Sequence, residues 1–211
     1  MKWQHDSALL PIDCFAYHFE VKKAAARAPF KKSKQTQLPS LALWQGEKPF
    51  ASLWWQVSDE GLHFRIEVNK PCEKVSFPYL ERGDGIELFL DTRDNKKSKV
   101  VSQYCHHFAV LPEAQEGKQV FDITKPHVYH MREKVDTELC VCKTELGNRS
   151  YTLELFFPKG MLYGYDVVSF DRLGFTYKIH GLNRPAQYFN LRGDEYNIAH
   201  HPHLWGSFLI K

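Results

Sequence analysis

Several histidines stand close together in the chain and carry the nitrogen donors that bind transition metals. Residues 200–203 read His-His-Pro-His, and His106-His107 form a second pair. In an extended segment the side chains of His201 and His203 point to the same side, which permits convergence on one metal ion. Pro202 favours an extended or turn-like backbone, which suits an exposed loop equally well. We favour hydrogen-bonded or solvated imidazoles in a loop and predict no metal site.

The cysteines raise the same question. There are five, an odd number without framework spacing, at positions 14, 72, 105, 140 and 142. This usage is expected where thiols stay reduced. On a strand, Cys140 and Cys142 would share one face, either as small apolar residues facing a core or as half of a metal or redox site. A zinc site needs three or four ligands and no other is near in the sequence, so we favour the core.

Carboxylates able to act as a general acid and base occur on predicted strand faces, at Glu87, Asp91 and Glu154. A glycosidase would need two of them roughly 5 to 10 Å apart. Solvated acidic residues on strand faces explain the same pattern. The chain also lacks Gly-x-Ser-x-Gly, a Gly-rich phosphate loop and His-Glu-x-x-His. We therefore predict that the protein is not an enzyme.

Flat aromatic side chains are abundant, with five tryptophans and 10 tyrosines. Such rings stack on the C–H faces of sugars and also anchor protein partners, although core packing is their commoner role. Trp54 and Trp55 are adjacent and would face opposite sides of a strand. Trp205 begins the last predicted strand. Trp44 lies just before the regular strand pattern and is the best candidate for an exposed ring.

The charge balance excludes some partners. The 28 Lys and Arg residues exceed the 25 Asp and Glu residues by three, with 11 histidines counted as neutral, which is too weak a field to make nucleic acid the default partner. No apolar run reaches the roughly 18 residues that span a bilayer. The first residues show no apolar h-region and no cleavage site, so we expect a cytoplasmic protein made without a Sec-type signal; a specialised export route would leave no mark.

The elements that position these residues follow from a change of pattern near residue 51. From there onward apolar and polar residues alternate with a period of two, which is typical of strands with one buried face. Leu62 to Asn69 is the clearest case. The predicted strands are residues 51–58, 62–69, 85–91, 100–111 (ended by Pro112), 139–145, 150–157, 174–180 and 205–211. Eight to ten short strands with few short helices predict an all-β fold, an antiparallel two-sheet β-sandwich of the immunoglobulin or jelly-roll kind.

We expect this sandwich to be one domain, at residues 41–211. An irregular, basic segment at residues 1–40 would be packed on it or flank it. No acidic residue occurs from Val21 to Gly46, whereas six Lys or Arg residues lie between Lys22 and Lys34. The segment is either a solvated arm or a docking site for an anionic partner, and nothing near it in the sequence decides between the two.

Five segments follow one another in a distinctive order: 53–68 (LWWQVSDEGLHFRIEV), 83–91 (GDGIELFLD), 151–158 (YTLELFFP), 173–177 (LGFTY) and 202–209 (PHLWGSFL). Together they resemble family 9 carbohydrate-binding modules and their DOMON-like relatives, over about residues 50 to 211. The resemblance implies a β-sandwich without catalysis of its own. One sheet's polar face and the flanking loops would hold the end of a sugar chain.

The resemblance also implies site residues. In that family the ligand lies between two tryptophans, and a Glu of the acidic strand and polar side chains of neighbouring strands hydrogen-bond its hydroxyls. The Glu matches Glu87 and a polar position matches Lys178, and the period-two pattern turns both away from the core. Where the clamp tryptophans are expected, this chain offers Tyr79 and Tyr196, whose phenol rings also stack. We predict that these four residues and Trp44 bind the ligand.

Other interpretations stay open beside the carbohydrate one. Some family members hold structural calcium, and residues 91–95 supply oxygens, but the lysines that follow would repel a cation, so we predict no cofactor and leave calcium open. The DOMON-like kinship raises haem binding through His107 or His180. A third interpretation is an intracellular module that kept the sandwich, lost the sugar and binds a protein partner.

Overall fold

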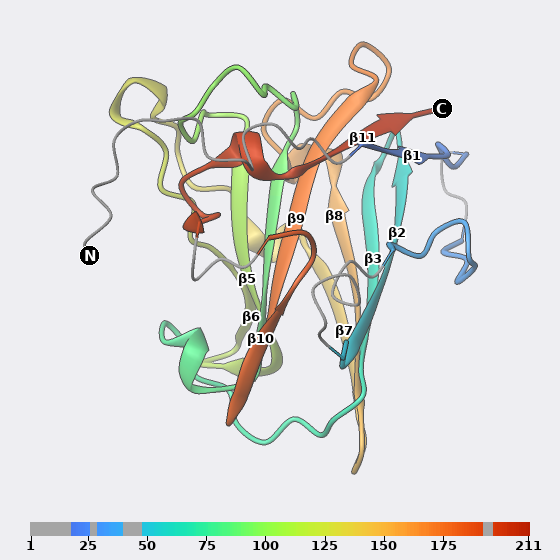
Figure 1. Cartoon of the computed structure of the whole chain (residues 1–211), viewed down its shortest axis with the longest axis vertical. Helices are drawn as coiled ribbons and strands as arrows, with labels where there is room; N and C mark the ends of the chain where they lie inside the picture. The colour runs from blue at the N-terminus through green and yellow to red at the C-terminus, as the bar shows by residue number, and fades with distance from the viewer. Residues whose placement is uncertain (1–17, 26–28, 40–47, 192–195) are drawn as a thin grey trace, which may run out of the picture.

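The computed structural model describes residues 18–25, 29–39, 48–191 and 196–211, and they form two sheets packed face to face (Figure 1). The strands are β1 (His18–Val21), β2 (Ala51–Ser58), β3 (Gly61–Val68), β4 (Gly85–Asp91), β5 (Cys105–Gln115), β6 (Lys118–Asp122), β7 (Val141–Leu146), β8 (Tyr151–Pro158), β9 (Arg172–Gly181), β10 (Arg184–Tyr188) and β11 (Gly206–Ile210). Short 3₁₀ turns join them: η3 (Leu80–Arg82), η4 (Val128–His130), η5 (Thr137–Leu139), η6 (Lys159–Met161) and η7 (Pro202–Leu204).

The seven-stranded sheet has the order β1-β11-β9-β4-β5-β6, with β10 also paired to β9, and the four-stranded sheet has the order β2-β3-β8-β7. All pairs are antiparallel except β1 and β11, which run parallel. In Figure 1, β5, β9 and β10 stand on one side and β2, β3 and β7 on the other. The predicted all-β, antiparallel two-sheet sandwich is confirmed, and the parallel pair of β1 with β11 is an exception to it.

The core lies between the sheets and is built from alternate residues of the strands. Leu62, Phe64, Ile66 and Val68 of β3 are each at most 2% exposed, as the period-two pattern predicts. Across the sandwich, Trp55 stacks on Phe175 at a ring-centroid distance of 5.1 Å. Burial of such large apolar surfaces between two sheets is the main force that holds them together.

Trp54 points the other way from Trp55, as expected for adjacent strand residues. The ammonium group of Lys32 lies over its ring, 4.4 Å from the centroid. Cys140 and Cys142 are half-buried and pack against the main core, which confirms the apolar interpretation of this pair. Burial raises the pKa of the Cys140 thiol to about 12, so this thiol is protonated at neutral pH.

Both predicted boundaries of the strand at residues 100–111 are wrong. Residues 100–104 precede β5, and β5 does not end before Pro112 but continues to Gln115. Pairing with β4 ends at Val110, and the register between β5 and β6 shifts between Val110 and Gln115. Proline lacks only a backbone N–H, so it is tolerated where the ladder is interrupted in this way.

The predicted basic segment contributes a strand. β1 pairs with β11, and beyond it the Ala24 N–H donates to the carbonyl of Val57 in β2. Two of its lysines form ion pairs within the fold, Lys23 with Asp59 (2.6 Å) and Lys32 with Glu67 (2.7 Å). This part of the segment therefore closes one side of the sandwich, while the boundary at residue 40 stays a prediction.

Loops cover much of the outer face of the seven-stranded sheet. One apolar cluster joins Phe89 and Cys105 to Tyr188, Ile198 and Trp205. A second joins Ala109 and Leu111 to Leu80, with Phe77 and Ile123 packed against it. A band of polar side chains lies between the two clusters. In the part of the chain that the structure describes, no helix is long and apolar enough to cross a membrane.

Candidate functional site

Glu87 is the centre of the polar band. Its carboxylate accepts a hydrogen bond from Nε2 of His107 on β5 and another from Nε2 of His180 on β9, each at 2.6 Å. Lys178, on the same strand as His180, places its ammonium nitrogen 4.0 Å from Oε1. The four side chains are between 6 and 21% exposed, so the cluster is largely shielded from water.

The strand register explains why both imidazoles reach one carboxylate. The residue directly opposite Glu87 on β5 is Ala109, and the residue opposite His180 on β4 is Gly85. Because these two positions carry little or no side chain, His107 and His180 can lean diagonally onto Glu87.

Burial by itself would raise the pKa of Glu87, but the hydrogen bonds from the two imidazoles outweigh it and hold that pKa far below its usual range. The carboxylate is therefore ionised at neutral pH and only accepts hydrogen bonds. Each Nε2 must then carry a hydrogen, which leaves Nδ1 of His107 with no hydrogen bond to any described residue.

Lys178 lies between two partners, the carboxylate of Glu87 and the ring of Tyr188, whose centroid is 5.3 Å from its ammonium nitrogen. Ile86 and Leu88 on either side of Glu87 are buried in the core. Glu87 and Lys178 thus point outward and lie together, as the alternation pattern predicts. Their role toward a ligand stays a prediction.

A pocket of about 250 Å³ opens beside His107. Its walls come from β5, from the segment that follows β6 and from two loops, and it is lined by Phe77, Pro78, His107, Ile123, Lys125, Ala199 and His200. The first loop precedes η3 and the segment Gly83-Asp84; the second precedes η7 and Pro202. These are the two loops in which the family resemblance places the clamp rings.

The first wall is held in place from both sides. The ring of Phe77 stacks on Phe121 at 3.9 Å, and the side-chain amide of Gln115 exchanges two hydrogen bonds with the Phe77 backbone. At the base of this loop the buried carboxylate of Asp84 accepts from the backbone N–H of Glu73 and pairs with Lys70. The wall is therefore preformed.

Two of the three predicted stacking residues, Tyr79 and Tyr196, are not among the described residues that line this pocket. Tyr79 follows Pro78 but is 52% exposed, with the Arg82 guanidinium over its ring. Tyr196 is half-buried and packs against the cluster that contains Trp205. Trp44 lies outside the described residues. Phe77 and Pro78 supply the apolar wall instead, and the Phe-Pro pair just before Tyr79 is the sequence signal that marks them.

Solved structures with the same architecture place this geometry in context. A family 9 carbohydrate-binding module from Caldicellulosiruptor kristjanssonii, solved with cellotriose, superimposes with a TM-score of 0.60 at 14% identity, over 92% of this chain and 93% of that one. The module solved with glucose gives 0.60 at 15% identity, over 92% and 95% of the two chains. A candidate carbohydrate-binding protein from Bacteroides uniformis gives 0.58 at 13% identity, over 93% and 100%.

The chain has the family 9 carbohydrate-binding module fold. The predicted resemblance is confirmed at the level of the fold, and the β-sandwich extends over nearly the full length of the compared modules. No protein-family model and no curated protein sequence matches the chain. The relationship is therefore visible in the arrangement of strands and not in the sequence as a whole.

The residues suggested for calcium have other partners in this CBM9-like fold. Asp91 accepts hydrogen bonds from the backbone N–H groups of Arg93 and Asn95, both at 2.9 Å. The ammonium group of Lys96 lies 2.8 Å from the Asp94 carboxylate and donates to the Trp205 carbonyl at 2.6 Å. A lysine thus supplies the positive charge beside these oxygens, and a calcium ion here stays untested.

The histidines proposed for a metal or for haem have separate positions. The rings of His201 and His203 are 5.6 Å apart, and the described residues contain no group of three or more potential ligands placed for a metal ion. His200 is exposed and lines the pocket. His107 and His180 each direct Nε2 to Glu87, so haem ligation through that atom would have to break this bond.

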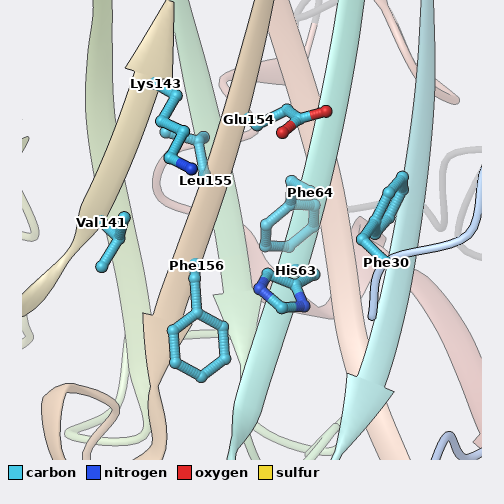
Figure 2. Close-up of a pocket in the computed structure, with 8 residues that line it drawn as sticks. All are labelled: Phe30, His63, Phe64, Val141, Lys143, Glu154, Leu155 and Phe156. Atoms are coloured by element: carbon cyan, nitrogen blue, oxygen red, sulfur yellow. The ribbon is translucent and has the colours of Figure 1, made fainter. Parts of the chain in front are cut away.

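A second pocket, of about 120 Å³, lies on the outer face of the four-stranded sheet (Figure 2). The rings of Phe30, His63 and Phe156 follow one another across this face. Burial lowers the pKa of His63, although Glu154 opposes the shift, and Glu154 itself is paired with Arg65. This pocket lies away from Glu87 and from the two loops of the family resemblance, so the pocket beside His107 is the stronger candidate site.

Proposed function

We propose that this protein is a non-catalytic module that binds carbohydrate in the pocket beside Glu87. The observation that carries the proposal is the position of that pocket. It lies between the loops before Gly83-Asp84 and before Pro202, next to the acidic strand β4, in a fold whose solved relatives hold glucose and cellotriose. A volume of about 250 Å³ is below the roughly 300–1,000 Å³ of sites for drug-sized ligands, which suits one or two sugar rings.

The residues that line the pocket suit both the C–H groups and the hydroxyl groups of a pyranose. Phe77 and Pro78 present an apolar wall against which the C–H groups of a sugar can pack. His107, Lys125 and His200 supply polar groups for its hydroxyls. Nδ1 of His107 is directed by the bond between Nε2 and Glu87, so this imidazole is held in one orientation before a ligand arrives.

The same geometry argues for binding without turnover. Within the described part of the chain, no residue that lines the pocket is a carboxylate, whereas glycoside hydrolysis ordinarily uses two. Glu87 lies behind His107, and its pKa is held too low for it to donate a proton at neutral pH. The carboxylate therefore orients the imidazoles and does not act as a general acid.

The test is an NMR titration of the full chain with glucose and cellobiose. We expect chemical-shift changes at His107 and at residues 77–78 and 199–200. His200→Ala should weaken binding at least threefold, because the exposed imidazole lines the pocket but supports no core contact. His18→Ala is the matched control, an exposed histidine on β1 that should leave binding unchanged. Absence of any response across a broad panel of mono- and oligosaccharides would contradict the proposal.

A further inference from the structure

We infer that the sugar held in this pocket carries an anionic group, as a hexuronate or a sugar phosphate does. The inference rests on the proposed function and specifies the class of ligand. Its starting observation is the charge of the lining: among the described residues, the polar side chains that line the pocket are His107, Lys125 and His200, and none of the described lining residues is acidic. An acidic sugar would bring an opposite charge to this lining, which a neutral sugar cannot do.

The carboxylate of Glu87, which is bonded to His107, does not neutralise the pocket. Each oxygen of Glu87 is taken by an imidazole N–H, and the ammonium group of Lys178 lies 4.0 Å from one of them. With one carboxylate and one ammonium group, the Glu87 cluster is neutral when both imidazoles are neutral and positive when either is protonated. It therefore adds no negative charge to the site.

Lys125 is the cation at the pocket. It is exposed, and among the described residues it forms no ion pair and no side-chain hydrogen bond. Other lysines of the same fold do find carboxylates, as Lys23 and Lys32 do. A negatively charged ligand would give Lys125 the partner that the chain does not provide.

The backbone on which Lys125 sits is fixed to the floor of the pocket. The Thr124 hydroxyl donates to Asp122 and accepts from the backbone N–H of His107 at 2.8 Å. The Ile123 N–H donates to the His107 carbonyl at 2.9 Å. Pro126 follows directly and restricts the Lys125 backbone to extended conformations. The ammonium group is thus carried on a rigid segment beside the imidazole of His107.

The test compares acidic and neutral sugars by calorimetry on the full chain. The probes are glucose, glucuronate, glucose 6-phosphate and inorganic phosphate, each measured at low and at moderate salt. We expect glucuronate or glucose 6-phosphate to bind at least tenfold more tightly than glucose, with a preference that weakens as salt rises. Tighter binding of glucuronate would identify a carboxylate as the recognised group, and tighter binding of glucose 6-phosphate would identify a phosphate.

Two variants test whether Lys125 causes the preference for acidic sugars. Lys125→Gln should reduce the preference for the acidic sugar to less than threefold, because glutamine keeps a polar group for the hydroxyls but carries no charge. Lys31→Gln, an exposed lysine whose backbone contacts β2 on the other sheet, should leave the preference intact. Because both side chains are exposed, neither substitution is expected to disturb folding.

The outcomes separate this inference from the proposed function. Equal binding of glucose and the acidic sugars would overturn the inference and leave the carbohydrate module standing. Inorganic phosphate binding as tightly as glucose 6-phosphate would also overturn it, since the pocket would then recognise an anion and not a sugar. If no sugar binds at all, the proposed function fails and the inference fails with it.

Discussion

His107 donates from Nε2 to Glu87 across 2.6 Å although the residue opposite His107 in the β4–β5 register is Phe89. The imidazole stacks on the Phe89 ring at 4.1 Å and reaches Glu87 diagonally, over the small side chain of Ala109. One histidine thereby connects the apolar cluster around Phe89 to the carboxylate and to the open pocket. Under the proposed function, a substitution of His107 would therefore affect both stability and binding.

Glu87→Gln should cost about 1–3 kcal/mol of unfolding free energy. The amide can accept at only one of its two positions, so one imidazole N–H loses its charged acceptor in a largely buried place. Because the pKa of Glu87 is lowered on folding, its contribution is present above its ordinary pKa of 4.5 and is lost as the pH falls toward the folded-state value. Denaturant unfolding at pH 7 and at pH 3.5 should therefore show a smaller difference between variant and wild type at the lower pH.

Glu81→Gln is the control for this prediction, because Glu81 lies on η3 with its side chain mostly exposed. It should change the unfolding free energy by less than about 0.5 kcal/mol. Equal losses in the two variants would show that the bonds from His107 and His180 to Glu87 do not stabilise the fold.

Asp84→Asn should be one of the most destabilising single polar substitutions, with a loss of about 3–5 kcal/mol. Asp84 is fully buried and paired with Lys70, itself 4% exposed, so the variant leaves an ammonium group in the interior without an opposite charge. The double variant Asp84→Asn, Lys70→Met removes that charge and should recover part of the loss. Urea unfolding of the three proteins measures this, and a double variant no more stable than the single one would refute the explanation.

His106 should make the fold sensitive to acid. Burial, and next the nearby Arg132 guanidinium, lower its pKa from 6.5 to about 3. Since the unfolded chain binds this proton more readily, the stability falls as the pH drops below about 6.5 and continues to fall until about pH 3. Between pH 7 and pH 4.5 the loss from this one group should be about 2 kcal/mol.

His106→Gln tests that assignment, because the glutamine does not titrate. The variant is expected to be less stable at pH 7, since Arg132 donates to Nδ1 of His106 at 3.1 Å in the wild type. Its stability should nevertheless decline less steeply with acid. A parallel decline of the two proteins between pH 7 and pH 4.5 would assign the acid sensitivity to other groups.

The amino-acid sequence alone was sufficient for the fold class, and β3 shows why. Its alternation of apolar and polar residues is local, and any two-layer arrangement must bury the same four side chains. The outward direction of Glu87 and Lys178 follows from the same alternation. β1, β6 and β10 were not predicted, because strands of four or five residues with mixed polarity carry too short a pattern.

The arrangement of the candidate site could not be predicted from the sequence, because it depends on contacts between segments far apart in the chain. No local pattern indicates that His107 and His180 meet on Glu87, because that meeting depends on the register of β4 with both β5 and β9. Phe77 rather than Tyr79 lines the pocket because the loop before η3 is anchored by Gln115 and Asp84. The sequence by itself determined which face of each strand is apolar. The tertiary structure decided which polar residues of different strands lie side by side, because side-chain periodicity does not determine which strands pair or in which register.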